Sequence, residues 1–157
     1  MNTDSNKIEI IAFNEALKDY IKTLNYEWLE KYFRVETGDF IALSNPKEHI
    51  IDKGGFIYFA KLNNEIVATV SLLKKSETIY EIGKMAVTPK AQGNKIGNLL
   101  VEHCLEIAKQ KQFKKLILYS NTKLEAAINL YRKHGFVETT LEEGLYERAN
   151  IKMEKKL

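Results

Sequence analysis

The sequence predicts a mixed α/β domain, and three patterns in its 157 residues support that fold class. Two strand-like runs, GFIYFAKL and EIVATVSLL, flank Asn63-Asn64, a polar two-residue connection suited to a tight hairpin. From Ile96 to Ala108, apolar residues recur at helical spacing over several turns. A compact strand-like run, KKLILYS, follows that helix and precedes a second amphipathic helix. Hairpins followed by a strand–helix–strand crossover are typical of one sheet with helices on its faces.

The N-terminal third is predicted to hold one strand and two helices. KIEIIAF reads as the first strand. Asn14 is placed to cap a helix whose apolar residues have helical spacing, namely Leu17, Tyr20, Ile21 and Leu24. We predict a second short helix over residues 25–33. Residues 35–55 are expected to be irregular, because Asn45-Pro46 signals a turn and Gly54-Gly55 breaks regular structure.

The remaining elements follow the central hairpin. Residues 78–87, TIYEIGKMAV, form a further strand that stops at Thr88-Pro89. After the helix from Ile96 and the strand KKLILYS, another helix is marked by Leu124, Ala127, Ile128 and Tyr131. Gly135 is placed to end that helix. FVETT and LYERANIKMEKK are predicted as the two closing strands.

Composition indicates one soluble domain over residues 1–157. The net charge of +3 is mild and the lysines lie on expected helix surfaces, so we expect no nucleic-acid partner. The single cysteine, Cys104, excludes an intramolecular disulfide and is interpreted as a core residue, with a nucleophilic role as the alternative. The start, MNTDSNKIEI, is unlike a secretory signal, and no apolar run has membrane-spanning length. We expect a cytoplasmic protein without a membrane partner.

The run QGNKIG, residues 92–97, connects the predicted strand 78–87 to the long helix. A helix N-terminus presents unpaired N–H groups and a partial positive charge, and glycine lets the backbone approach an anion closely. A phosphate seat is therefore one interpretation. A plain polar turn, with Gly93 supplying a positive φ, is the other. Neither the Walker pattern nor the dinucleotide-binding pattern of glycines is present.

Three stretches, YEIGKMAVTPKAQGNKIGNLL, LILYSNTKLEAAINLYRKHGF and YERANIKME, together resemble the GNAT superfamily of N-acetyltransferases, which move acetyl from acetyl-CoA to an amine. The resemblance covers residues 6–155 in element order and is specific over 79–137. It implies a central, largely antiparallel sheet with one splayed parallel pair and about four flanking helices. The family loop reads [RQ]-x-x-G-x-[GA]. Here Gln92 and Gly97 match, whereas Lys95 stands where the family has its middle glycine.

The resemblance assigns the acetyl-CoA contacts to residues 79–137. The strand ending at Val87 would splay from the one beginning near Leu116, and the pantetheine arm would pair with backbone in the gap. The residues implied are Met85, Ala86 and Val87 for the arm, and Gln92, Gly93, Asn94, Lys95, Ile96, Gly97 and Asn98 for the diphosphate. Asn121 would bond the arm or the substrate, with a helix cap shared with Thr122 as the alternative. Asn129 would reach the cofactor by family analogy.

Two residues are candidates for acid and base. Tyr131 matches the family tyrosine near the CoA sulfur, although its helical spacing also suits a half-buried core tyrosine. Glu81 is the candidate base, because strand alternation would place it on one face with Gly83, Met85 and Val87. A solvated strand-end carboxylate is the alternative. Glu77 or ordered water would be substitutes.

The acceptor side is expected near residues 13–55 and 138–153. Its candidates are Trp28, Tyr32, Phe33, Arg34, Tyr146 and Arg148. An arginine there would hold a substrate carboxylate or form a surface salt bridge, and nothing selects among small-molecule and peptide amines. Three histidines, His49, His103 and His134, and one cysteine give no metal-ligand spacing, so we expect no metal.

The function predicted is acetyl transfer to an amine by direct attack in a ternary complex. The rival is a regulatory module that binds acyl-CoA without turning it over. A homodimer is plausible by analogy with the family.

Overall fold

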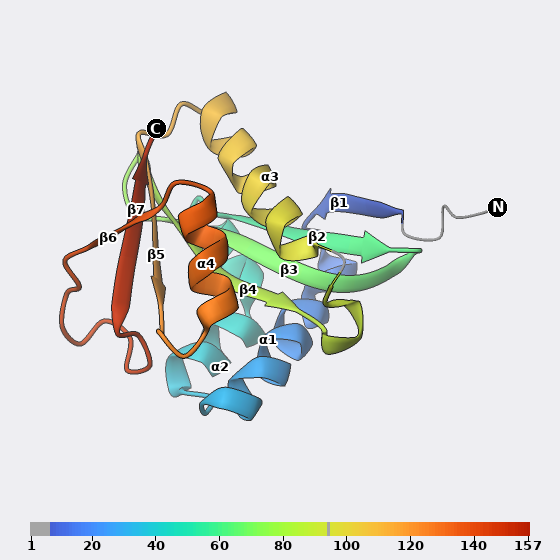
Figure 1. Ribbon diagram of the computed structural model, residues 1–157. Coiled ribbons are helices and arrows are strands. Elements are labelled where there is room, and N and C mark those ends of the chain that lie inside the picture. The colour runs from blue at the N-terminus through green and yellow to red at the C-terminus, as the bar shows by residue number, and fades with distance from the viewer. Residues whose placement is uncertain (1–6, 94) are drawn as a thin grey trace.

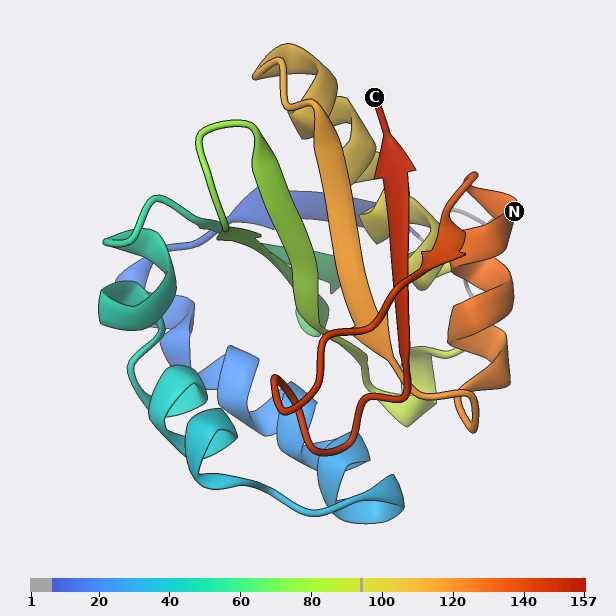
Figure 2. The ribbon, with the colours of Figure 1, turned by 90° about the vertical axis from the view of Figure 1, so that its left-hand side faces the viewer.

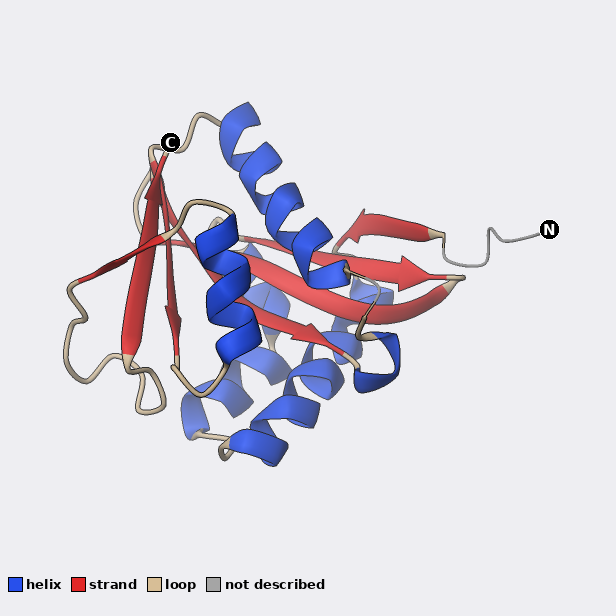
Figure 3. Ribbon diagram, viewed as in Figure 1, coloured by secondary structure: helices blue, strands red, loops and turns tan. Residues whose placement is uncertain are grey.

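The computed structural model describes residues 7–93 and 95–157, which form a seven-stranded sheet covered by helices (Figures 1 and 3). The strands are β1 (Ile8–Ala12), β2 (Phe56–Leu62), β3 (Glu65–Lys74), β4 (Ile79–Val87), β5 (Lys115–Ser120), β6 (Val137–Thr139) and β7 (Ile151–Lys156). The α-helices are α1 (Lys18–Tyr32), α2 (Thr37–Ser44), α3 (Ile96–Gln110) and α4 (Glu125–Lys133). Short 3-10 helices span Glu15–Leu17 and Pro89–Ala91, and a π-helical turn spans Lys47–Ile51.

The strand order is β1-β2-β3-β4-β5-β7-β6, and β4–β5 is the parallel pair among the described strands. The other neighbours pair antiparallel. Helices α3 and α4 cover one face of the sheet, whereas α1 and α2 cover the other (Figure 1). Each face has its own apolar cluster, with Leu100 and Cys104 of α3 in one and Ile21 and Leu29 of α1 in the other. The predicted fold class is confirmed.

The two short helices predicted near the N-terminus are one helix, α1, preceded by a turn that Asn14 caps through its bond from the Ala16 N–H. The apolar stripe from Ile21 to Leu29 is interrupted by Asn25, a buried amide. Its Nδ2 donates to the Ile21 carbonyl at 2.9 Å and to the Lys84 carbonyl on β4 at 3.0 Å. Because this polar residue is satisfied by tertiary contact, the helix continues through it.

The segment predicted to be irregular, residues 35–55, contains α2 and the π-helical turn. Asp39 stabilises the start of α2, because its Oδ2 accepts a hydrogen bond from the Glu36 N–H at 3.0 Å. Leu43 and Ile50 are buried against α1 and β2 residues. Pro46 lies just before the π-helical turn, at a position where no helical hydrogen bond requires the N–H group that proline lacks.

The central hairpin and the closing strands are confirmed, the last one with a correction. Asn63 and Asn64 have φ values of 52° and 72°, as a tight hairpin turn requires. The last strand begins at Ile151, six residues later than predicted from Leu145. Residues 140–150 instead form a loop that passes close to α2 (Figure 2).

Cys104 lies in the core, as predicted, with no exposed surface. Burial raises the pKa of its thiol to about 12. The thiol is therefore protonated at neutral pH, which argues against the nucleophilic alternative.

Candidate active site

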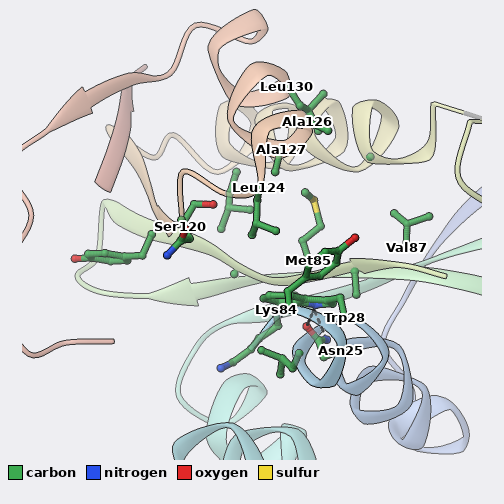
Figure 4. A pocket seen from close by; sticks show the side chains of 18 of the residues that line it. Asn25, Trp28, Lys84, Met85, Val87, Ser120, Leu124, Ala126, Ala127 and Leu130 are labelled. Carbon is green, nitrogen blue, oxygen red and sulfur yellow. Dashed lines mark hydrogen bonds between the residues drawn. The ribbon is translucent and has the colours of Figure 1, made fainter. Parts of the chain in front are cut away.

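The site lies where the two parallel strands separate. Pairing between β4 and β5 runs over Ile79–Ile82 and Lys115–Leu118 and then stops, while β4 continues to Val87 with only β3 on its other edge. A cavity of about 640 Å³ opens there, lined by Gly83–Val87 of β4 and by Tyr119–Asn121 at the end of β5. The ends of α3 and α4 lie above it and α1 lies below (Figure 4). The splayed pair is therefore present as expected.

A β-bulge at Lys84 shapes the free edge of β4. The residue has φ 51°, and the register with β3 shifts between the pairs Ser71–Gly83 and Thr69–Ala86. The extra residue changes which side chains share a face. Met85 and Val87 pack with the α3-side cluster, which also holds Tyr80 and Ile82 of β4.

The prediction that Glu81, Gly83, Met85 and Val87 share a face is therefore wrong. Strict alternation would have made it true, but the bulge reverses the alternation after Gly83. Figure 4 shows Met85 and Lys84 pointing to opposite sides of β4. Gly83 directly precedes the bulge, and a glycine inside a strand can signal one, but the prediction assumed strict alternation along the strand.

The loop before α3 has a backbone conformation suited to binding an anion. Gly93 has φ 92° with open space where a Cβ would stand, and Lys95 takes the left-handed conformation at φ 58°. Lys95 thus keeps the conformation that glycine adopts most easily, at a backbone cost of about 1–2 kcal/mol. Gln92 lines the cavity and its Nε2 donates to the Val87 carbonyl at 3.5 Å. Asn94 lies outside the described residues.

The first turn of α3 is packed closely against α4. A Cβ on Gly97 would lie 3.3 Å from Leu130 Cδ2, so this glycine permits close helix packing as well as lining the cavity. Ile96 also lines the cavity, but its side chain is buried in the core. Asn98 points elsewhere: its side chain bonds Glu102 at 3.0 Å and His134 at 2.8 Å. Asn98 is also absent from the residues that line the cavity, unlike Lys95, Ile96 and Gly97.

Tyr131 lines the cavity from α4 and is 7% exposed. Its ring meets Phe136 edge to face, with centroids 6.1 Å apart. Among the described residues its hydroxyl has no hydrogen-bond partner. Burial raises the pKa of Tyr131, and Cys104 raises it further. The phenol is therefore protonated at neutral pH and able to donate a hydrogen bond.

Glu81 lines the cavity from β4 and is 3% exposed, which excludes the alternative of a solvated carboxylate. The Tyr146 hydroxyl donates to its two oxygens at 3.0 and 3.2 Å, and Lys75 Nζ lies 3.0 Å from Oε1. Burial and the Glu81 charge raise the pKa of Tyr146. Glu77, the suggested substitute, is exposed and pairs with Lys74.

Arg148 is held by an internal ion pair. Its two terminal nitrogens donate to the two oxygens of Asp39, each at 2.8 Å, and Nη1 also lies 3.4 Å from Glu36. Burial raises the pKa of Asp39, but the Arg148 hydrogen bonds and the Glu36 N–H outweigh burial and leave it lowered. The guanidinium also lies 5.9 Å from the Trp28 ring. Asp39 was missed from the sequence because α2 was not predicted.

The other predicted residues divide between the cavity and the surface. Trp28, Tyr32 and Phe33 line the cavity, whereas Arg34 forms an exposed salt bridge with Glu147 at 2.7 Å. Asn121 lines the cavity with both ends of its amide bonded, donating to the Arg148 carbonyl at 2.8 Å and accepting the Lys123 N–H at 2.9 Å. The bond to Lys123 forms an Asx turn in the loop before α4 rather than the helix cap of the alternative, because the N-cap residue of α4 is Leu124, without a side-chain cap bond.

Asn129 is the one expected cofactor contact that α4 turns away from the cavity. Its side chain is exposed, whereas Ala126, Ala127 and Leu130 line the cavity from the same helix. Among the described residues there is no cluster of three or more His, Cys, Asp or Glu that could hold a metal. Within the same residues, no helix is both long and apolar enough to cross a membrane.

Comparison with known proteins gives three findings. A family model described as "Acetyltransferase (GNAT) family" matches residues 13–136. A UPF0039 protein of Schizosaccharomyces pombe is 27% identical over 138 residues, covering 83% of this chain and 91% of that protein. A GNAT family acetyltransferase from Staphylococcus aureus superposes with a TM-score of 0.85 at 21% identity, covering 96% of this chain and 99% of that one.

Another structurally similar protein was solved as a complex with a ligand. It is a PaiA N-acetyltransferase from Thermoplasma acidophilum in complex with coenzyme A. Its TM-score is 0.78 at 20% identity, with 96% of this chain and 99% of that one covered. At this level of identity, the match establishes the fold.

Proposed function

Because the chain belongs to the GNAT family of acetyltransferases, whose acetyl donor is acetyl-CoA, we propose that it acetylates a primary amine by direct attack in a ternary complex. One observation carries the proposal: the free edge of β4 from Gly83 to Val87 lies beside the N-terminus of α3. An amide-bearing arm can pair with that edge as an added strand, and a diphosphate suits the helix end.

The residues of β4 and of the loop before α3 suit the two parts of acetyl-CoA. We assign the pantetheine arm to the backbone of Met85, Ala86 and Val87. The diphosphate is assigned to the N–H groups of residues 92–98, where Gly93 leaves open space and Lys95 adds a positive charge. The similar T. acidophilum protein was solved in complex with coenzyme A, which supports coenzyme A as a ligand of this fold.

The chain's own side chains supply the proton steps. Glu81, directly or through an ordered water, accepts the proton of the attacking ammonium, since attack requires a neutral amine. Tyr146 positions that carboxylate through its hydroxyl proton, which is shared between the two carboxylate oxygens. The amine nitrogen bonds to the carbonyl carbon, backbone N–H groups of β4 polarise the carbonyl, and the carbon–sulfur bond breaks. Tyr131, kept protonated by burial, donates a proton to the departing thiolate, and the second proton that the nitrogen loses on forming the amide replaces it.

We extend the proposal to the whole chain. Residues 1–157 act as a single N-acetyltransferase domain, in which 79–137 bind acetyl-CoA and 13–55 with 138–153 bind the acceptor. The acceptor is a small molecule or a peptide. A cytoplasmic location and a homodimer stay predictions.

The test is release of free thiol from acetyl-CoA in the presence of amine pools. Turnover that depends on the amine supports the proposal. Tyr131→Phe and Glu81→Gln are run in parallel, the first read on kcat and the second on the pH–rate profile. Coenzyme A binding without thiol release from any pool would instead favour the regulatory module.

A further inference from the structure

Lys84 is a charged side chain in the cavity that the donor side does not use. It comes from the β-bulge of β4 and lines the cavity with a side chain that is 13% exposed. Figure 4 shows it pointing away from Met85 and from α4, which is the side assigned to the donor. Lys84 therefore belongs to the acceptor end, beside Trp28 and Asp39.

The ammonium of Lys84 lacks a hydrogen bond among the described residues. The nearest opposite charge is Asp39 Oδ1 at 3.8 Å, beyond hydrogen-bond distance, and both Asp39 oxygens already accept from Arg148. Arg148, Glu81 and Lys75 are the other charged groups that act on it. A nearly buried ammonium with three free donors is costly, so this arrangement indicates a site for an acceptor of hydrogen bonds. Burial lowers the pKa of Lys84 accordingly.

The arginine that would otherwise receive a carboxylate is already occupied. Both terminal nitrogens of Arg148 bond Asp39 at 2.8 Å, so its planar fork is filled. Arg34 lies outside the cavity lining, in its exposed pair with Glu147. Lys123 also lines the cavity, but it is exposed and its Nζ donates to the Tyr32 carbonyl at 3.4 Å. Among the described residues, Lys84 is thus the sheltered cation of the acceptor end with donors to spare.

We infer that Lys84 binds a carboxylate on the acceptor, and that the acceptors are amino acids or other small amines that carry one. This rests on the proposed function, in which the amine is directed to Glu81. Glu81 and Lys84 lie on the same stretch of β4 and both line the cavity, so they present opposite charges to one ligand. An amino acid carries the complementary pair. The rings of Trp28 and Tyr119 line the same end and can contact its side chain.

The turnover test compares each amino acid with its amide and with the amine that lacks the carboxyl group. We expect a kcat/KM advantage of about tenfold or more for the acid, the value of one hydrogen-bonded charge pair in a sheltered site. Lys84→Met should abolish that advantage through KM, so that the acid, the amide and the amine without a carboxyl group reach similar kcat/KM values. Lys84→Arg should restore part of it. Lys109→Met removes an exposed charge from α3 and is the matched control.

A binding test reaches the same site without turnover. Trp28 is the single tryptophan and lines the cavity, so its fluorescence can follow N-acetyl amino acids and N-acetyl amino acid amides added to protein saturated with coenzyme A. Tighter binding of the acids, lost in Lys84→Met, supports the inference. Equal binding of acids and amides overturns it. Thiol release that is absent with every amine overturns the proposed function but leaves the binding comparison decisive for Lys84.

Discussion

The buried pair between Asp39 and Arg148 joins α2 to the loop before β7, and breaking it gives a measurable prediction. Asp39→Asn keeps the shape of the side chain and removes its charge. The two side chains are 4% and 18% exposed, and two hydrogen bonds of 2.8 Å join them. The substitution leaves the guanidinium of Arg148 largely buried, with Glu36 at 3.4 Å as its remaining anion.

The size of the effect follows from that burial. Removing one partner of a buried pair costs about 3–5 kcal/mol, because the other charge stays desolvated. Glu36 compensates in part, so we expect about 3 kcal/mol, the lower end of that range. For a domain of this length, that loss corresponds to a Tm lower by about 6–12 °C.

Thermal and urea unfolding followed by circular dichroism measure the effect, and the chain offers its own control. Glu147→Gln removes the Arg34–Glu147 salt bridge, which also joins the α1–α2 region to the loop before β7, but whose side chains are 72% and 65% exposed. We expect this control to lose less than about 1 kcal/mol. If Asp39→Asn lost no more than Glu147→Gln, the reasoning from burial would be refuted.

Four further predictions follow from the same contacts. The pKa of Asp39 is lowered in the folded state, so its contribution to stability is present above its unfolded value of 3.8 and is lost as pH falls through the folded value; acid titration of stability should be shallower in Asp39→Asn. Tyr131→Phe should lower kcat by about ten- to hundredfold while coenzyme A affinity measured by calorimetry is unchanged; an unaltered kcat contradicts the acid role. Lys95→Met should weaken coenzyme A binding and flatten its dependence on salt, which titrations at several ionic strengths would reveal; identical salt slopes contradict a phosphate contact. Gly97→Val should destabilise the domain by about 1–3 kcal/mol in urea unfolding, because its Cβ would crowd Leu130 Cδ2 at 3.3 Å; unchanged stability would mean that the α3–α4 contact relaxes freely.

The sequence was sufficient for those parts of the fold that local pattern determines. The hairpin at Asn63-Asn64 could be read because its turn needs residues that tolerate positive φ. The helix from Ile96 could be read because its apolar face is continuous. The opening between β4 and β5 followed from resemblance rather than from local pattern, since strand propensity does not show where pairing stops.

What the sequence missed depends on contacts between distant segments. Two helices were predicted where one runs through Asn25, because the Lys84 carbonyl on β4 that satisfies this amide cannot be foreseen from local pattern. Gly83 is compatible with a bulge but does not show that Lys84 adopts a positive φ, so strict alternation placed Glu81 on the wrong face relative to Met85. The partnership of Glu81 with Tyr146 joins residues 65 positions apart, and no spacing rule reveals such a pair.

The central claim is that acetyl-CoA occupies the opening of β4 and the turn before α3. Titration of isotope-labelled protein with acetyl-CoA, followed by amide chemical shifts, tests it directly. We predict saturable shifts concentrated at residues 83–87 and 92–98, with little change in β1 and β2. Absence of shifts, or shifts centred on a different face of the sheet, would contradict the account.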